Sequence, residues 1–75
     1  MKAGDLIQDT SDGSIGLVLS DPRPYSVQER ADRVYHKNEK YAMVLWPSNE
    51  GTPVRMDMLA VKNGWVEIVE ESRGF

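Results

Sequence analysis

The chain has 75 residues, of which 40% are hydrophobic and 28% charged, and its net charge is −3. These values predict one folded domain with a thin core, because disordered chains carry fewer large apolar residues and more net charge. They exclude a strongly basic protein that binds the phosphate backbone of nucleic acids along the whole length of the chain.

No long segment is strongly basic or acidic. The net charge is −2 over residues 1–20, +1 over 21–40 and −2 over 41–75. Cysteine is absent, which excludes disulfides and thiolate ligands and favours the cytoplasm or another reducing compartment. We find neither a signal peptide nor a membrane-spanning stretch, so we expect a soluble protein without a membrane partner.

A hairpin is predicted at the start of the chain. Residues 5–8 and 15–19 form its strands, and the Asp, Ser and Gly of residues 9–14 are typical of a turn. Three aliphatic residues of the second strand share one face at period two: Ile15, Leu17 and Leu19. Gly16 between them indicates a bulge, a tight bend or a close approach of another group.

The connection that follows has two possible structures. The prolines of residues 21–24 end the second strand, because each removes a backbone donor and fixes φ. Ser26 and Glu29 then fit a capping box, which predicts a short helix over 26–35. A long ordered loop is an equal alternative, since so short a helix is marginal without packing.

Residues 41–46 are the strongest strand in the chain, being aromatic and branched, free of charge and ended by a proline. Apolar residues on both of its faces favour burial within a closed barrel. Because neighbours alternate, either Tyr41 or Trp46 must lie near the surface. Residues 47–51 form the next turn.

Two further strands complete the pattern. Residues 52–57 alternate, with Val54 and Met56 inward and Arg55 and Asp57 outward. Residues 58–61 form either a helical turn or more strand. Residues 65–69 follow an Asn-Gly turn. Their alternation places Trp65 outward and Val66 and Ile68 inward.

The chain is therefore predicted to be all-β, with about five short antiparallel strands curled into a small barrel. The domain spans residues 1–69, with a long loop, or one short helix, between strands two and three. Residues 70–75 form a polar, flexible C-terminal tail.

Four segments carry a resemblance to a known fold family: Gly4-Asp5-Leu6-Ile7, Ile15-Gly16-Leu17-Val18, Val44-Leu45-Trp46 and Trp65-Val66-Glu67-Ile68-Val69. The pattern resembles Src-homology-3-like barrels and, more narrowly, short proteins of tailed bacteriophages, including phages of marine cyanobacteria. The resemblance covers residues 3–69 and implies a five-stranded barrel and a viral source, in the host cytoplasm or the virion. It transfers no binding residues, and the 21–40 insertion is longer than such barrels usually carry.

Catalytic and metal chemistry are not expected. His36 is the only histidine and stands in a charge-rich, solvated stretch, so no nucleophile–base pair is predicted. Asp9 and Asp12 belong to a turn that lacks the ligand spacing of a calcium loop. Glu70 and Glu71 lie in the expected tail. We therefore predict a protein that is not an enzyme and holds no cofactor or metal.

Large side chains outside the core are the remaining candidates for binding. Rings left on the surface of a small barrel can form a groove for peptides or cations. The candidate binding residues are Tyr25, Tyr35, Trp46, Arg55 and Trp65.

Two functions fit these residues. The favoured one is a protein-interaction or structural module that acts through the aromatic rim and the 21–40 insertion, with a protein partner or a second copy of itself. The alternative is a nucleic-acid-associated domain with a local basic patch, made of Arg23, Arg30, Arg33, Lys37 and Lys40, in which Tyr25 and Tyr35 stack on bases. The acids within that segment disfavour the alternative.

Overall fold

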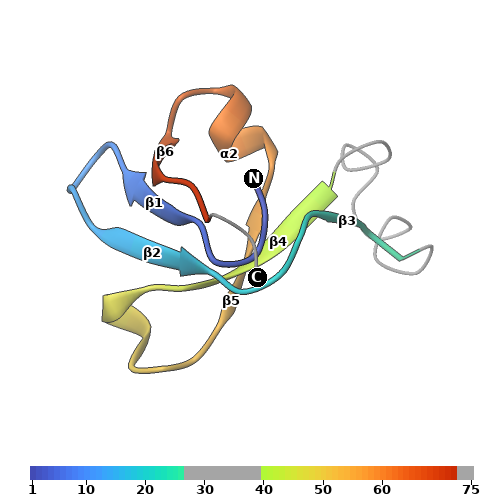
Figure 1. The fold of residues 1–75 in the computed structure, drawn as a ribbon, viewed down its shortest axis with the longest axis horizontal. Coiled ribbons are helices and arrows are strands. Elements are labelled where there is room, and N and C mark those ends of the chain that lie inside the picture. Colours follow the sequence, from blue (N-terminus) through green and yellow to red (C-terminus); the bar gives the residue numbers. More distant parts are fainter. Residues whose placement is uncertain (27–39, 73–75) are drawn as a thin grey trace.

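The computed structural model describes residues 1–26 and 40–72. This part of the chain is mostly antiparallel β-sheet, as predicted, with one short α-helix and one 3-10 turn (Figure 1). The strands are β1 (Leu6–Asp9), β2 (Ile15–Val18), β3 (Arg23–Pro24), β4 (Lys40–Leu45), β5 (Val54–Asp57) and β6 (Val66–Glu70). The turn is η2 (Pro47–Asn49) and the helix is α2 (Leu59–Lys62). None of the helices described here has the length and apolar character needed to cross a membrane.

The sheet runs in the order β3-β4-β2-β1-β6, and β5 pairs with β4. Every pairing is antiparallel. Val44 of β4 pairs with Val18 of β2 and with Val54 of β5, so these two strands flank β4. The first strand, β1, likewise lies between β2 and β6, which brings the two ends of the chain into one sheet.

The structure corrects the expected closed five-stranded barrel in two respects. The described strands number six, because the chain bends after β2 and returns to β4 as the two-residue strand β3. Pro24 is tolerated there because an edge strand can spare the missing N–H. Secondly, no pairing within residues 40–72 joins β5 to β6; α2 connects these strands and contacts both, so the sheet stays open.

One face of the sheet makes the core. Its fully packed side chains come from all five of the longer strands: Ile7, Val18, Ala42, Val44, Met56 and Val66. The inward positions predicted for Met56 and Val66 are confirmed, and Ile68 packs against the same cluster. The hairpin, the turn at 47–51 and the final strand are also confirmed.

Gly16 pairs with the core residue Ile7 and so lies on the core face, where another side chain occupies the space that a Cβ would need. A Cβ added to Gly16 would lie 2.8 Å from Cε3 of Trp46 and 2.9 Å from Cγ1 of Val44. Of the three explanations left open for this glycine, close approach of another group is therefore the one the structure supports.

The remaining predictions concern residues 58–61, the end of the domain and residues 26–35. Residues 58–61 are helical rather than extended, since α2 begins at Leu59. Strand β6 continues to Glu70, one residue past the expected domain end, and the backbone N–H of Ser72 donates to Asp5. The helix or loop expected over 26–35 lies, apart from Ser26, outside the described residues.

Candidate functional site

The face of the sheet opposite the core is unusually apolar. In β2 and just beyond it, Gly16 and Val18 are buried, whereas Ile15, Leu17 and Leu19 are 40%, 37% and 41% exposed. The shared face predicted for these three residues is correct, and it is the outward one. Solvated sheet faces are normally polar, so an aliphatic one calls for an explanation.

Strand register arranges this outer face into cross-strand rows. In the first row, Gln8 of β1 lies between Glu67 of β6 and Ile15 of β2. The second row runs across four strands, and its members are Glu70, Leu6, Leu17 and Leu45. The register between β1 and β6 shifts by one residue between the two rows, so Val69 lies between the paired residues Ile68 and Glu70. Paired residues on one face have side chains in contact range, so the leucines of the second row form a continuous strip.

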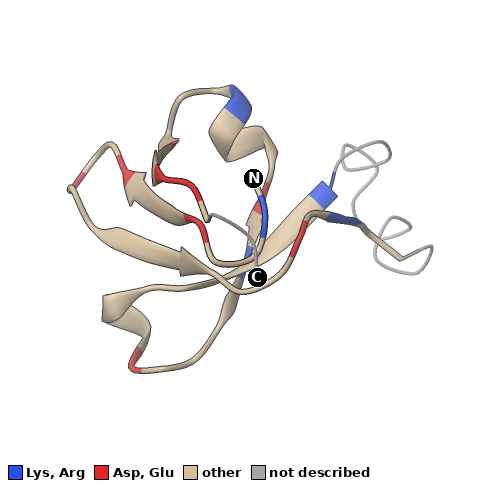
Figure 2. Cartoon of the chain, in the orientation of Figure 1, with Lys and Arg blue, Asp and Glu red and all other residues tan. Residues whose placement is uncertain are grey.

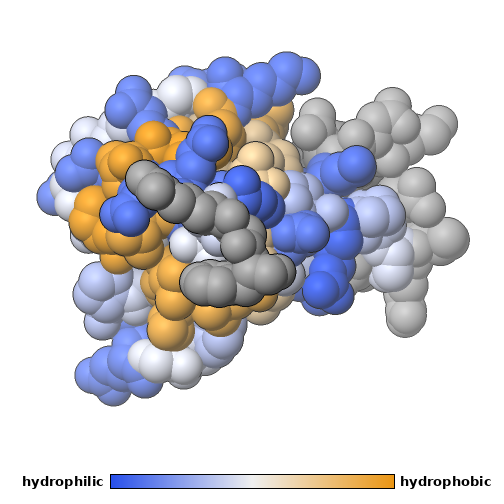
Figure 3. Space-filling view, in the orientation of Figure 1, coloured by the Kyte–Doolittle hydropathy of each residue, from blue (hydrophilic) through white to orange (hydrophobic). Residues whose placement is uncertain are grey.

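A shallow groove of about 270 Å³ lies over this strip. The leucines of the second row and Ile15 line it, and the turn after β4 closes one side. Its lining residues are Leu6, Ile15, Gly16, Leu17, Leu45, Trp46, Pro47 and Gly51. Figure 3 shows exposed apolar atoms over the part of the molecule where β1 and β2 lie in Figure 1, with hydrophilic atoms beside them. A concave apolar strip of this kind suits one or two aliphatic side chains.

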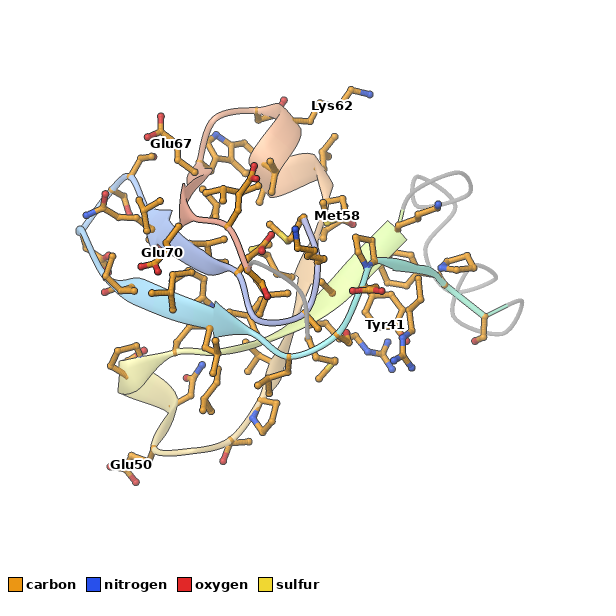
Figure 4. The ribbon with its side chains drawn as sticks, viewed as in Figure 1. Tyr41, Glu50, Met58, Lys62, Glu67 and Glu70 are labelled. Atoms are coloured by element: carbon orange, nitrogen blue, oxygen red, sulfur yellow. The ribbon has the colours of Figure 1, made fainter. Side chains whose placement is uncertain are left out.

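The border of the groove is acidic. Glu67 and Glu70 stand at the β6 end of the two rows, and Glu50 lies in the turn beside Gly51. Figure 4 shows these three glutamates on the left of the molecule, with Lys62 at the top and Tyr41 on the right. Among the described residues of the two rows there is no lysine or arginine.

The described bases lie elsewhere (Figure 2). Arg23 and Lys40 belong to β3 and β4 at the opposite end of the sheet, and Arg55 lies on β5. Lys2 is in the N-terminal turn and Lys62 is in α2. Arg23 and Lys40 therefore lie near the start of β4, away from Glu50, Glu67 and Glu70, although Asp21 and Asp57 lie at that end as well.

The predicted binding residues do not form one site. Trp65 points outward as expected, with 60% of its side chain exposed. Trp46 is half-buried, packs against the core and lines the groove. Tyr35 lies outside the described residues, as do Arg30, Arg33 and Lys37 of the alternative basic patch.

Tyr25 and Arg55 belong to a separate cluster at the other end of the sheet. Tyr25 is only 7% exposed, and its hydroxyl donates to Asp57 Oδ2 at 3.0 Å. Its ring centroid lies 4.9 Å from that of Tyr41, and the Arg55 guanidinium lies 5.0 Å from the Tyr41 centroid. Asp57 Oδ1 also accepts the N–H of Leu59 at the start of α2. This cluster ties β5 and α2 to the segment after β3, which is a structural role.

A buried carboxylate ties the two ends of the chain together. Asp5 is 1% exposed and accepts the backbone N–H of Lys2 at 2.9 Å and of Ser72 at 2.6 Å, one on each oxygen. Burial raises the pKa of Asp5, but these two hydrogen bonds and the nearby positive charges of Lys2 and the N-terminus outweigh it, so the pKa lies below the ordinary value of 3.8.

The hairpin turn behaves as predicted from its composition. Asp9 Oδ1 accepts the N–H and the hydroxyl of Ser11, and these bonds lower the pKa of Asp9. Asp12 Oδ1 accepts the N–H of Ser14, and Gly13 has a φ of +79°. Within residues 1–26 and 40–72 no group of three or more His, Asp or Glu side chains could hold a metal ion.

Sequence reasoning missed the leucine strip. It weighed the aromatic residues and overlooked Leu6, Leu17 and Leu45, because an apolar residue in a strand is ordinarily assigned to the core. The available signal was that β2 is apolar at odd and even positions alike, so one of its two faces had to remain outside. No family model, curated protein or solved structure matches this chain.

Proposed function

We propose that this protein is a non-enzymatic interaction module that binds a partner protein through the groove over Leu6, Leu17 and Leu45. The observation that carries the proposal is the aliphatic outer face, in which Ile15, Leu17 and Leu19 are each close to 40% exposed. Exposed contiguous apolar residues are costly to keep in water and commonly mark contact surfaces. The proposal moves the contact from the aromatic rim to this strip.

The fold proposed with it is a Src-homology-3-like barrel left open at one side. In support, β1 pairs with both β2 and the last strand β6, and the short helix α2 precedes β6. Small antiparallel folds of this kind serve as scaffolds for many unrelated contacts, so the function is argued from the surface alone.

The test uses the two tryptophans of the chain. Trp46 lines the groove and Trp65 does not, so a Trp65→Phe variant reports on the groove through its fluorescence. Random heptapeptides are selected on the native protein and counter-selected on Leu17→Ser. We expect the selected peptides to change the fluorescence emission of Trp46. Their affinity for Leu17→Ser should be at least about tenfold lower than for the native protein, because losing one well-packed contact costs about 1.4 kcal/mol of binding free energy.

Equal binding to the native protein and to Leu17→Ser would overturn the proposal, as would a selection that yields no binder. The control variant is Val69→Ser, which changes an exposed aliphatic residue that does not line the groove. Peptides seated in the groove should bind this variant as they bind the native protein. Circular dichroism of both variants checks that the fold is retained.

A further inference from the structure

The groove differs from an ordinary apolar patch in the charge of its border. Glu70 pairs with Leu6, just beyond a shift in register between β1 and β6, and Leu6 pairs with Leu17, so one glutamate lies at the end of the leucine strip. Strands lie about 4.8 Å apart, which places Glu70 roughly 10 Å from Leu17 across the sheet. If a bound peptide packs one side chain over Leu17, the adjacent peptide residues are close enough to contact the Glu70 carboxylate.

Two more glutamates belong to elements next to the groove, one on each side of it (Figure 4). Glu67 ends the first row, and Glu50 lies between Asn49 and Gly51 in the turn that closes the groove. All three glutamates are exposed, so their interactions with other charges are screened by salt. The groove therefore combines an apolar floor with a negative border on two sides.

We infer that the occupant of the groove is a short, extended, basic–apolar segment of a partner protein. Resting on the proposed function, this inference names the class of partner. One or two aliphatic side chains lie over Leu6, Leu17 and Leu45, and a lysine or arginine lies beside Glu70. Of the three glutamates, Glu70 is the one paired with a member of the leucine strip, so the basic residue is placed at the β6 end.

The same charges disfavour two other occupants. A second copy of this chain would present its own acidic border to the first, and like charges brought together at a contact are destabilising. A nucleic acid would bring phosphates to the same glutamates. The bases near the start of β4 lie at the opposite end of the sheet and do not offset this border.

The geometry of an extended chain fits the strip. Side chains at alternate positions of a strand lie about 6.7 Å apart, and Leu6 and Leu45 are two strand spacings, or about 10 Å, apart. Two leucines at alternate positions therefore cover about two thirds of the strip, and a basic residue two positions before them extends the peptide by about 6.7 Å more, to the β6 edge. The heptapeptide Lys-Lys-Ser-Leu-Ser-Leu-Ser has this pattern.

The experiment titrates the Trp65→Phe protein with that peptide and three matched ones. In the neutral and acidic peptides the two lysines become serines or glutamates, and in the fourth both leucines become serines. We expect the basic peptide to bind about three- to tenfold tighter than the neutral one at about 20 mM salt, with the acidic peptide weakest. The difference should shrink at about 300 mM salt, and the peptide without leucines should not bind.

Variants then locate the charge. Glu70→Gln should lower the affinity for the basic peptide about two- to fivefold and leave the neutral peptide unchanged. Asp21→Asn is the matched control, because it removes one negative charge outside both rows. Leu17→Ser should abolish binding of both the basic and the neutral peptide.

The outcomes separate the inference from the function on which it rests. If the basic, neutral and acidic peptides bind equally well and all depend on Leu17, the partner class is wrong while the groove remains a binding site. If Glu70→Gln and Asp21→Asn have equal effects, overall charge explains the preference and the inference fails. A dimer in light scattering that Leu17→Ser dissociates would show a second copy as the occupant. If no peptide binds in a Leu17-dependent way, the proposed function fails as well.

Discussion

Asp5 holds the N-terminal turn and the segment after β6 together. Each of its oxygens accepts one backbone N–H, from Lys2 and from Ser72. Asparagine offers one acceptor and places an NH₂ group against the other N–H. We expect Asp5→Asn to lower the free energy of unfolding by about 1–3 kcal/mol at neutral pH, the usual cost of leaving a buried donor unpaired. Urea unfolding measures this, and Asp21→Asn should cost less, because Asp21 accepts only the exposed N–H of Ala3 and asparagine keeps one oxygen to accept it.

The same residue predicts a pH dependence. The pKa of Asp5 is lower in the folded state than its ordinary value of 3.8, so the unfolded state binds the proton more readily. The stability that Asp5 contributes is therefore complete above pH 3.8 and is lost as the pH falls through the lower, folded-state pKa. Below about pH 5 the unfolding free energy of the native protein should fall more steeply than that of Asp5→Asn. Parallel curves would contradict this role for Asp5.

Gly16 and Trp46 form the second residue-scale contact. A methyl group at position 16 would lie 2.8 Å from the Trp46 ring, which is rigid, and 2.9 Å from Val44. We expect Gly16→Ala to cost about 1–3 kcal/mol of unfolding free energy through overpacking. In a double-mutant cycle, Trp46→Leu should relieve part of this cost, because the smaller side chain leaves room. Strict additivity of the two changes would contradict the contact.

At the level of a single strand, two adjacent residues of β2 belong to opposite faces of the sheet, one to the core and one to the outer face. Val18 is fully buried between β1 and β4, and Leu17 is 37% exposed beside it. Val18→Ala should lower the unfolding free energy by roughly 1.5–3 kcal/mol, and Leu17→Ala by no more than about 1 kcal/mol, although leucine is the larger residue. Chemical unfolding of both variants measures the difference. Equal losses would mean that Leu17 is also packed and that the outer face is not free to bind.

The order of the strands in the sheet explains which features of β2 could be predicted from the sequence and which could not. The hairpin of β1 and β2 and the strand β4 follow from alternation and turn residues, and both were predicted with nearly correct bounds. Which side of β2 faces the core was not predictable, because Ile15, Leu17 and Leu19 are as apolar as the buried Val18. That choice is made by pairing with β4 and by the Trp46 ring over Gly16, and both are long-range contacts.

At the scale of the whole molecule, the open sheet and the charge distribution were beyond local reasoning. The pattern of short strands favoured a closed barrel, but α2 occupies the connection between β5 and β6 and no pairing joins them in the described part of the chain. Summed over the chain, the charge is a modest −3. Only the fold brings Glu50, Glu67 and Glu70 to one side and Arg23 and Lys40 to the other.

If the outer face of β1, β2 and β4 is the binding surface, a bound peptide should perturb the methyl groups on that face, and methyl-resolved NMR detects such perturbations. The protein, labelled at isoleucine, leucine and valine methyls, is titrated with the basic heptapeptide. We predict shifts of the groove methyls, those of Leu6, Ile15, Leu17 and Leu45, while the core methyls of Ile7, Val18, Val44 and Val66 stay in place. Shifts confined to other residues, or no shifts at saturating peptide, would show that this face is not the binding surface.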